Sequence, residues 1–318
     1  MKSGNETNTT HFLLLGFAFQ GKMQFLFFAL ISIMFLTILI GNSLIVVITV
    51  TDPLLHIPMY YFLKNFALTE ICYSLTIVPK MLVILLVERK IISFTAWALQ
   101  LNCIILFVTC ESFLLGAMAY DRQAAICHPL HYATTMNRDR CFRMAIGSWL
   151  SGVPVTLGFT TWLFTPPFCG KTTVDHFFCD VPPVLKLVCA DTALCELLIF
   201  IAIAIILLIP FSLIALSYLH IVHAVLQIPS AVGQGRAFST CAAHLVVVTL
   251  FYSTTGIIHL RPKSSLSSSM KKMVSLSYII VTPMLNPIIS RNQEVKQSLR
   301  RCIDKWFLRK QAAVFSPS

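Results

Sequence analysis

Charged side chains are scarce in this sequence. Of 318 residues, only 12% are Asp, Glu, Lys or Arg, whereas 57% are hydrophobic and the mean hydropathy is +0.79. A water-soluble domain of this length could not cover its surface with so few charges. Apolar runs of about 20 residues recur, which is the length that a helix needs to cross a bilayer. The sequence therefore predicts an integral membrane protein.

The sequence also lacks the motifs of several protein classes. It shows no repeat that relates two halves, as many transporters do, and no nucleophile elbow, phosphate-binding loop or metalloprotease motif. His220 and His223 have the spacing of metal ligands on a helix, but no third ligand accompanies them. The N-terminus lacks the charged region, apolar core and cleavage site of a signal peptide. We therefore expect no enzymatic activity, no metal site and no removable signal peptide; a transporter or membrane enzyme is the alternative class.

Apolar segments long enough to span a bilayer are plentiful. They predict an all-α membrane protein, a seven-transmembrane helix bundle with a short amphipathic C-terminal helix. Residues 1–24 would form an extracellular N-terminal tail, residues 25–290 the bundle, and residues 291–318 a cytoplasmic amphipathic helix and tail. The seven segments run over Phe25–Val50, Pro58–Leu86, Ala96–Ala119, Met144–Trp162, Leu197–Ile221, Ala237–Leu260 and Met273–Ile289.

The orientation of the chain follows from its outer loops. Lys and Arg are spread almost evenly over the two sides, so the positive-inside rule decides little. Asn5 and Asn8 begin two glycosylation sequons, which are used only when the N-terminus is outside the cytoplasm. Cys169, Cys179 and Cys189 share one loop on that same side, which suggests an oxidising compartment. The two observations together predict an extracellular N-terminus and a cytoplasmic C-terminus.

The C-terminal region has an amphipathic pattern. In "RNQEVKQSLRRCIDKWFLRK" the basic residues fall on one helical face, opposite an apolar face formed by Val295, Leu299, Cys302, Ile303 and Trp306. Such a helix lies on a membrane surface that carries anionic lipid. The net charge of +11 fits this reading, with basic flanks against lipid headgroups rather than a nucleic-acid partner. A solvated basic tail is the alternative.

Two carboxylates lie within predicted spans. Glu70 is in "FALTEICYS" and Glu111 in "VTCESFL". A charge at the bilayer centre costs at least about 2.5–3.5 kcal/mol, so both should face the bundle interior. There they could share a Na⁺ or a proton, or hydrogen-bond to Asn42 and Asn286. Such a network could differ between two conformations, could be static helix packing, or could serve a proton-coupled transporter.

Several sequence motifs, spread over the whole chain, resemble those of a known family. They are "GN" in the first segment, "LHIPMYYFL" at the second, "MAYDR…AICHPLHY" after the third, "SY" in the fifth, "RAFSTCAAHL" at the sixth and "PMLNPII" in the seventh. In this order and spacing they resemble the odorant receptors, rhodopsin-like receptors of the tetrapod-type olfactory class. The resemblance implies a plasma-membrane protein that binds a small volatile odorant in the outer half of the bundle. It also implies coupling to a heterotrimeric stimulatory olfactory G protein, and thereby to adenylyl cyclase.

The resemblance assigns a conformational switch to the cytoplasmic half. Arg122 would end the third helix at the cytoplasmic face, with Asp121 paired to it in the resting state. An outward swing of the sixth helix would free Arg122 to face the G protein. Tyr218, Asn286 and Pro287 would belong to the same switch.

Three positions depart from the family pattern. Gln123 stands where the family has tyrosine, and "NPIISRN" lacks another tyrosine and is two residues short. Trp97 occupies the place of the third-helix cysteine that normally bonds to the second outer loop, and Cys103 is badly placed to replace it. The resemblance then implies an unpaired Cys179 and a bridge between Cys169 and Cys189. A non-signalling or retained family member is therefore the alternative function.

The resemblance also places a ligand pocket. Its predicted lining is mostly apolar with a few hydroxyls, which suits a small volatile with one polar group. No acid is among these residues, which disfavours an amine held by an ion pair. The predicted lining comprises Ile104, Ile105, Val108, Thr109, Ser112, Ala202, Ile203, Ile206, Tyr252, Thr255, His259, Leu276 and Ile279.

Overall fold

The structure is a computed structural model. It describes residues 11–14, 21–87, 91–164, 173–174, 193–259, 276–289, 295, 297–302 and 304. Its long helices are α1 (Lys22–Thr51), α2 (Pro58–Leu86), α3 (Phe94–Cys127), α5 (Arg138–Phe164), α7 (Ala193–Leu226) and α8 (Ala231–His259). Residues 276–289 add a π-helical turn, η3 (Ser277–Val281), followed by α10 (Thr282–Ile289). Short cytoplasmic elements are η1 (Pro53–Leu55), η2 (Pro129–His131) and α4 (Tyr132–Thr135).

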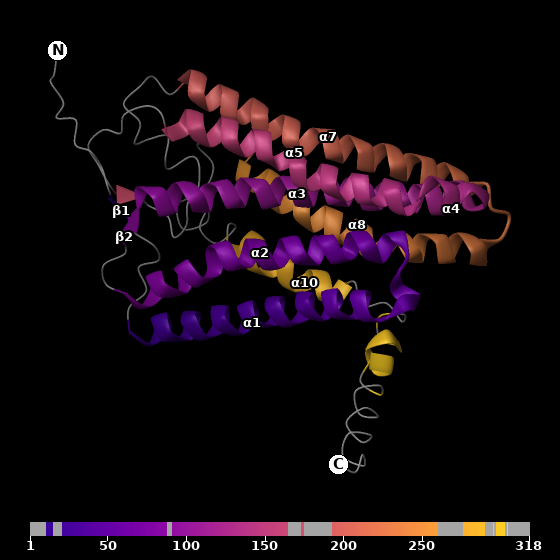
Figure 1. Cartoon of the computed structure of the whole chain (residues 1–318), viewed down its shortest axis with the longest axis horizontal. Helices are drawn as coiled ribbons and strands as arrows, with labels where there is room; N and C mark the ends of the chain where they lie inside the picture. The colour runs from indigo at the N-terminus through magenta and orange to yellow at the C-terminus, as the bar shows by residue number, and fades with distance from the viewer. Residues whose placement is uncertain are drawn as a thin grey trace, which may run out of the picture.

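These helices lie side by side in one bundle, with α3 near its centre (Figure 1). Helix α3 packs against α2, α5, α7 and α8, while α1 packs against α2 and α10. Each of the seven predicted spans coincides with a helix over the described residues, and α2 has the predicted bounds. Among the described residues, five helices are long and apolar enough to cross a membrane, and α5 with 27 residues is also long enough.

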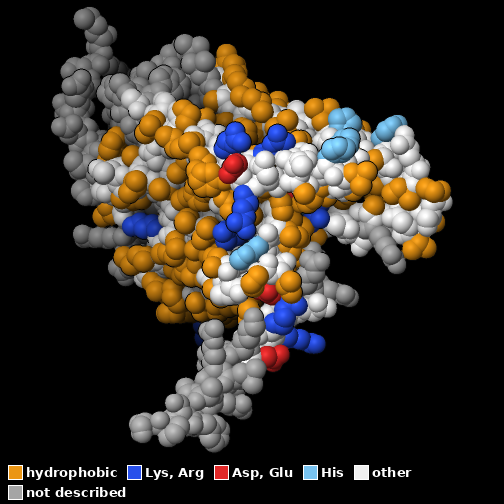
Figure 2. All heavy atoms as spheres, turned by 45° about the vertical axis from the view of Figure 1, so that its right-hand side comes forward, with side chains coloured by type: hydrophobic (Ala, Val, Ile, Leu, Met, Phe, Trp, Pro, Cys, Tyr) orange, Lys and Arg blue, Asp and Glu red, His pale blue; other side chains and the backbone are white. Residues whose placement is uncertain are grey.

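The outer surface of the bundle is apolar. Ile40 and Leu219 are exposed by 67% and 65%, and hydrophobic side chains cover much of the face shown in Figure 2. A helix that is apolar on all sides needs a hydrocarbon surrounding or a buried position, and these side chains have no protein neighbour to cover them. They therefore form the lipid-facing surface of the protein.

Small residues allow close contact between helices. A Cβ atom added at Gly41 of α1 would lie 2.9 Å from Cγ of Pro287 in α10. One added at Gly152 of α5 would lie 2.8 Å from Cδ1 of Leu106 in α3. Only glycine permits these approaches, as is usual where membrane helices pack by van der Waals contact.

A small β-sheet lies at the outer end of the bundle, which the sequence did not predict. Strand β1 (His11–Leu14) is its central strand and comes from the N-terminal tail. It pairs antiparallel with β2 (Ile91–Ser93) and parallel with β3 (Thr173–Val174). The predicted tail over residues 1–24 therefore contains an ordered strand.

The predicted amphipathic segment lies at the opposite end of the bundle, below the end of α1 (Figure 1). Residues 297–302 are helical. Val295, Leu299 and Cys302 pack against an apolar cluster formed by the end of α1, η1 and the start of α2. The segment thus turns its apolar face to the bundle over the described residues.

Candidate functional site

The predicted pocket residues lie on four neighbouring elements. Ile104 and Val108 of α3, Ile203 of α7, Tyr252 of α8 and Leu276 all pack against the same buried core. Thr109, Ser112, Thr255 and Ile279 are almost completely buried. Ile105, Ala202 and Ile206 are partly buried on the same helices. The side chain of His259 lies outside the described part of the structure, and the ligand-binding role of the whole set stays a prediction.

Two hydroxyl groups of this set have no hydrogen-bond partner among the described residues. They are Oη of Tyr252 and Oγ1 of Thr255, both buried and three residues apart on α8. Residues three apart lie on one face of a helix. A buried hydroxyl without a partner costs about 1–3 kcal/mol. A ligand with one polar group could satisfy either hydroxyl, so this face of α8 is well suited to bind one.

The two membrane carboxylates are buried, as predicted. Glu70 is 1% exposed and Glu111 is 3% exposed. The hydroxyl of Thr69 and the thiol of Cys110, their neighbours in sequence, lie 3.7 Å apart. This contact joins α2 and α3 at the level of the two carboxyl groups.

Asn42, one of the two asparagines predicted to contact these carboxylates, makes its described hydrogen bonds to backbone carbonyls. Asn42 Nδ2 donates to the carbonyl oxygens of Ile38 (3.1 Å) and Pro283 (3.4 Å), and so joins α1 to α10. Residue 287, four positions further along the helix, is a proline and has no N–H, so the carbonyl of Pro283 lacks its regular helical donor and is free to accept from Asn42. The side chain of Asn286 is not described.

No ion pair within 4.0 Å joins Asp121 to Arg122 among the described residues, and their pairing in the resting state stays a prediction. The Asp121 carboxylate is 1% exposed and accepts a hydrogen bond of 2.8 Å from the hydroxyl of Tyr132 in α4. Tyr132 belongs to the "HPLHY" motif, but nothing in the sequence indicated that it would contact Asp121.

Arg122 borders a cavity between α2, α3 and α8. The cavity has a volume of about 50 Å³, and its polar lining comprises Tyr60, Arg122, Thr240 and His244. It is large enough for a few water molecules. The guanidinium of Arg122 contacts the sulfur of Met59, and no carboxylate of the described residues forms an ion pair with it. The Arg122 side chain therefore contacts the Met59 sulfur and borders a cavity.

His244 connects three helices beside this cavity. Its Nδ1 lies 2.8 Å from the hydroxyl of Tyr218 on α7, and its Nε2 lies 3.2 Å from the carbonyl oxygen of Leu115 on α3. Because a carbonyl can only accept, Nε2 carries the proton and Nδ1 accepts from tyrosine. The Tyr218 and His244 rings are also stacked. His244 lies in the "RAFSTCAAHL" motif, but its role required partners from two distant helices.

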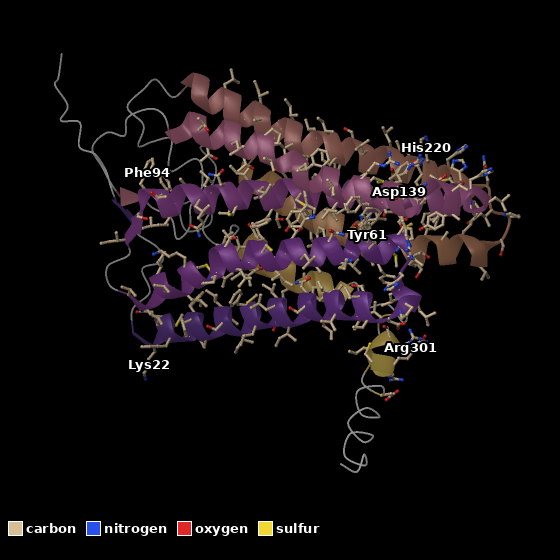
Figure 3. The ribbon with its side chains drawn as sticks, viewed as in Figure 1. Lys22, Tyr61, Phe94, Asp139, His220 and Arg301 are labelled. Atoms are coloured by element: carbon tan, nitrogen blue, oxygen red, sulfur yellow. The ribbon has the colours of Figure 1, made fainter. Side chains whose placement is uncertain are left out.

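Gln123, the departure that follows Arg122, has a specific partner. Its Nε2 lies 2.9 Å from Nδ1 of His220 near the end of α7, a residue that Figure 3 labels. His223 instead contacts Gln227. No group of three or more metal-ligating side chains occurs among the described residues. These histidines therefore take part in helix contacts at the cytoplasmic end.

Asp52 fixes the amphipathic segment to the first cytoplasmic loop. Its Oδ2 accepts hydrogen bonds from Ser298 (2.6 Å) and from Nε (3.1 Å) and Nη2 (2.8 Å) of Arg301. Its Oδ1 accepts from the backbone N–H of Leu54. These contacts lower the pKa of Asp52 from 3.8 to about 2. The hydrogen bond from Ser298 has the largest effect, Arg301 and Leu54 add to it, and burial opposes it. Arg301 lies just below the end of α1 in Figure 3.

Comparison with known proteins identifies the family. The profile described as "Olfactory receptor" matches residues 31–310, which is nearly the whole chain. This chain belongs to the olfactory receptor family. Human (Homo sapiens) olfactory receptor 10A7 is 50% identical over 308 residues, covering 96% of this chain and 98% of that receptor. Human olfactory receptor 10A5 is 49% identical over 308 residues, covering 96% and 97%.

Family membership confirms several predictions from the sequence. The protein is a seven-helix G-protein-coupled odorant receptor of the plasma membrane, and it is not an enzyme. The predicted sequons at Asn5 and Asn8 and the predicted bridge between Cys169 and Cys189 lie outside the described residues. They stay predictions, as do the roles of Pro287 and Tyr218 in the switch.

Proposed function

We propose that this receptor binds a small volatile with one polar group between α3, α7, α8 and residues 276–279, and then activates a stimulatory G protein that raises cAMP. The observation that carries the proposal is that α8 bears both the unpartnered hydroxyls and the histidine that joins it to its neighbours. Tyr252 and Thr255 offer free hydroxyls toward the outer half. Two to three turns further in, His244 fastens the same helix to α3 and α7.

The two halves of α8 are coupled because the helix moves as a rigid element. A ligand that draws Tyr252 and Thr255 toward itself changes the position of α8 relative to α3. The contacts of His244 are then made in one arrangement and broken in the other, so the ligand biases the two states by its differential affinity. The cavity beside Arg122 makes the closed arrangement less tightly packed there and eases its opening.

An exposed leucine marks where a cytoplasmic partner would dock. Leu130 of η2 is 93% exposed, in the loop directly after α3. The loop also carries Tyr132, which holds Asp121. A large apolar side chain in water beside the switch is suited to the centre of a protein interface. We therefore place a contact with the G protein at Leu130.

Leu130→Ala should lower the maximal cAMP response without changing the odorant concentration for half-maximal response. Losing a central apolar contact costs about 1–2 kcal/mol of binding, or roughly 5- to 30-fold in affinity for the G protein. The measurement is a cAMP reporter assay at matched surface density. Leu54→Ala is the control, because Leu54 is 67% exposed on the first cytoplasmic loop, in η1. Equal loss in both variants would contradict a specific contact.

The proposed function is tested by surface staining of an N-terminally tagged receptor beside a cAMP reporter. The panel should contain volatile alcohols, aldehydes, ketones and amines. We expect dose-dependent cAMP for some neutral volatiles. Good surface expression with no cAMP response to any of them would instead favour a non-signalling receptor.

We also propose that the buried carboxylates Glu70 and Glu111 bias the switch. Glu111 Oε1 and Ser74 Oγ are buried oxygen atoms without a hydrogen-bond partner among the described residues. Oxygen donors of this kind suit a hard cation such as Na⁺, or a proton held on a carboxyl group. Either would stabilise one arrangement of α2 and α3.

Glu111→Gln should therefore change basal cAMP more than odorant affinity. The amide keeps the shape of the side chain but removes its charge and its titration. The measurement compares basal and maximal cAMP, surface level and half-maximal odorant concentration with those of the unmodified receptor. Unchanged signalling at an unchanged surface level would show that the carboxylates only pack the helices.

A further inference from the structure

The sheet at the outer end joins three segments that are distant in sequence. His11, Phe12 and Leu13 of β1 lie opposite Ser93, Ile92 and Ile91 of β2. On its other side, β1 pairs with β3, with Leu13 next to Thr173 and Leu14 next to Val174. Strand β1 is therefore the connection between the loop that carries β3 and the loop that carries β2.

Strand β2 is itself held firmly to the helices. Lys80 of α2 donates a hydrogen bond of 3.0 Å to the carbonyl oxygen of Ile91. The hydroxyl of Ser93 accepts from the backbone N–H of Ala96 at 3.3 Å and so caps the N-terminus of α3. Ile92, between them, is buried with 4% exposure. A strand fixed in this way offers β1 a rigid edge to pair with.

Trp97, one turn into α3, stands where the family has a cysteine, so no disulfide can join this position to the outer loop. Its side chain is 0% exposed, so the indole fills the space at this end of the helix. Cys103, further along α3, is free. Backbone pairing through β1 is thus a noncovalent link between the outer end of α3 and the loop that contains β3.

We propose that β1 is a strap that holds β3 beside β2 at the outer end of α3. Strand pairing satisfies backbone groups of all three segments at once, and a central strand that leaves exposes two edges. The predicted pocket begins at Ile104, about 15 Å along α3 from Phe94. The strap therefore closes the outer side of the pocket; this last step rests on the proposed function, whereas the pairing itself does not.

The pairing is tested by cross-linking in the full-length receptor. Phe12→Cys with Ile92→Cys places two thiols at paired positions. The control is His11→Cys with Ile91→Cys, because His11 pairs with Ser93 and is two residues out of register with Ile91. Diagonal neighbours in a sheet are about 7–8 Å apart, beyond the reach of an unstrained disulfide.

We expect mild oxidation of surface receptor to join Phe12→Cys to Ile92→Cys at least about tenfold faster than the control pair. Mass spectrometry of unreduced peptides identifies which cysteines have joined and so separates this bond from those of the native cysteines. Restricting the measurement to surface-labelled receptor removes molecules that failed to fold. Equal rates for both pairs, or no bond in either, would overturn the proposal whether or not any odorant is known.

The consequence for ligand binding is tested by Leu13→Pro against Leu13→Ala. Leu13 is paired on both sides, and proline removes its backbone donor and fits only at sheet edges. We expect proline, but not alanine, to speed the decay of the cAMP response after odorant is washed out. An unchanged decay with a formed Phe12–Ile92 cross-link would refute closure of the pocket and leave the pairing intact.

Discussion

His244→Phe should raise basal cAMP strongly at matched surface density. Phenylalanine keeps a ring of similar size beside Tyr218 but loses both hydrogen bonds, to Tyr218 and to the carbonyl of Leu115. Each such bond contributes about 0.5–1.5 kcal/mol net. Because both join α8 to its neighbours in the closed arrangement, their loss shifts the ratio of open to closed receptor by roughly 5- to 150-fold.

A matched variant separates the two bonds. Tyr218→Phe removes only the hydrogen bond from tyrosine to His244. It should raise the ratio of open to closed receptor by roughly 2- to 10-fold, and basal cAMP should rise with that ratio. Neither variant changes a residue of the predicted pocket, so the rank order of odorants by potency should stay the same. Basal cAMP equal to that of the unmodified receptor in His244→Phe would show that this contact does not hold the receptor closed.

Asp52→Ala should release the amphipathic segment from the bundle. The Asp52 side chain is buried, with 6% exposure, and Ser298 is completely buried, so its hydroxyl would lose its partner. Arg301 is 40% exposed and water would partly replace its lost partner, so it contributes less. We expect about 2 kcal/mol in total, or roughly a 30-fold fall in the ratio of docked to free segment.

Amide hydrogen exchange over residues 297–302 measures this release directly. The control is Asp139→Ala, which removes an exposed acid near the start of α5 on the same cytoplasmic face, labelled in Figure 3. Exchange in residues 297–302 should speed up by roughly 30-fold in Asp52→Ala and stay unchanged in Asp139→Ala. Unchanged exchange in both variants would mean that apolar packing alone holds the segment.

The pH dependence of docking follows from the same acid. With the segment docked, the hydrogen bonds from Ser298 and Arg301 help to lower the pKa of Asp52 from its ordinary value of 3.8 to about 2. A lowered pKa contributes stability that is fully present above pH 3.8 and is lost as the pH falls toward 2. Docking should therefore be equally strong from pH 5 to pH 8, after correction for the intrinsic exchange rate.

The ends of a membrane span were predictable from the sequence where a single residue type, such as proline, starts the helix. Pro58 fits the first turn of a helix, and α2 begins at that residue. The third span was predicted to end at Ala119, but α3 continues to Cys127. The charges of Asp121 and Arg122 mark where the helix approaches the cytoplasm and do not end it, because a helix can continue into water.

The side-chain contacts in the cytoplasmic half of the bundle were less predictable, because each joins residues that are far apart in sequence. Ser298 is 246 residues from Asp52, and His244 is 129 residues from Leu115. The motifs include Tyr132, Tyr218 and His244, but a motif cannot say which side chains meet in the folded protein. Although the "NPIISRN" segment after α10 is two residues short of the family pattern, Ser298 and Arg301 both bind Asp52.

The central claim is that an odorant moves α8 away from its neighbours in the cytoplasmic half. It is tested most directly by the distance between spin labels at Phe142 of α5 and Val232 of α8, which are 55% and 66% exposed. Labels introduced through unnatural amino acids avoid the native cysteines. A volatile that raises cAMP should shift this distance to a longer population, and His244→Phe should show part of that shift without odorant. An unchanged distance at a saturating dose of such a volatile would contradict the account.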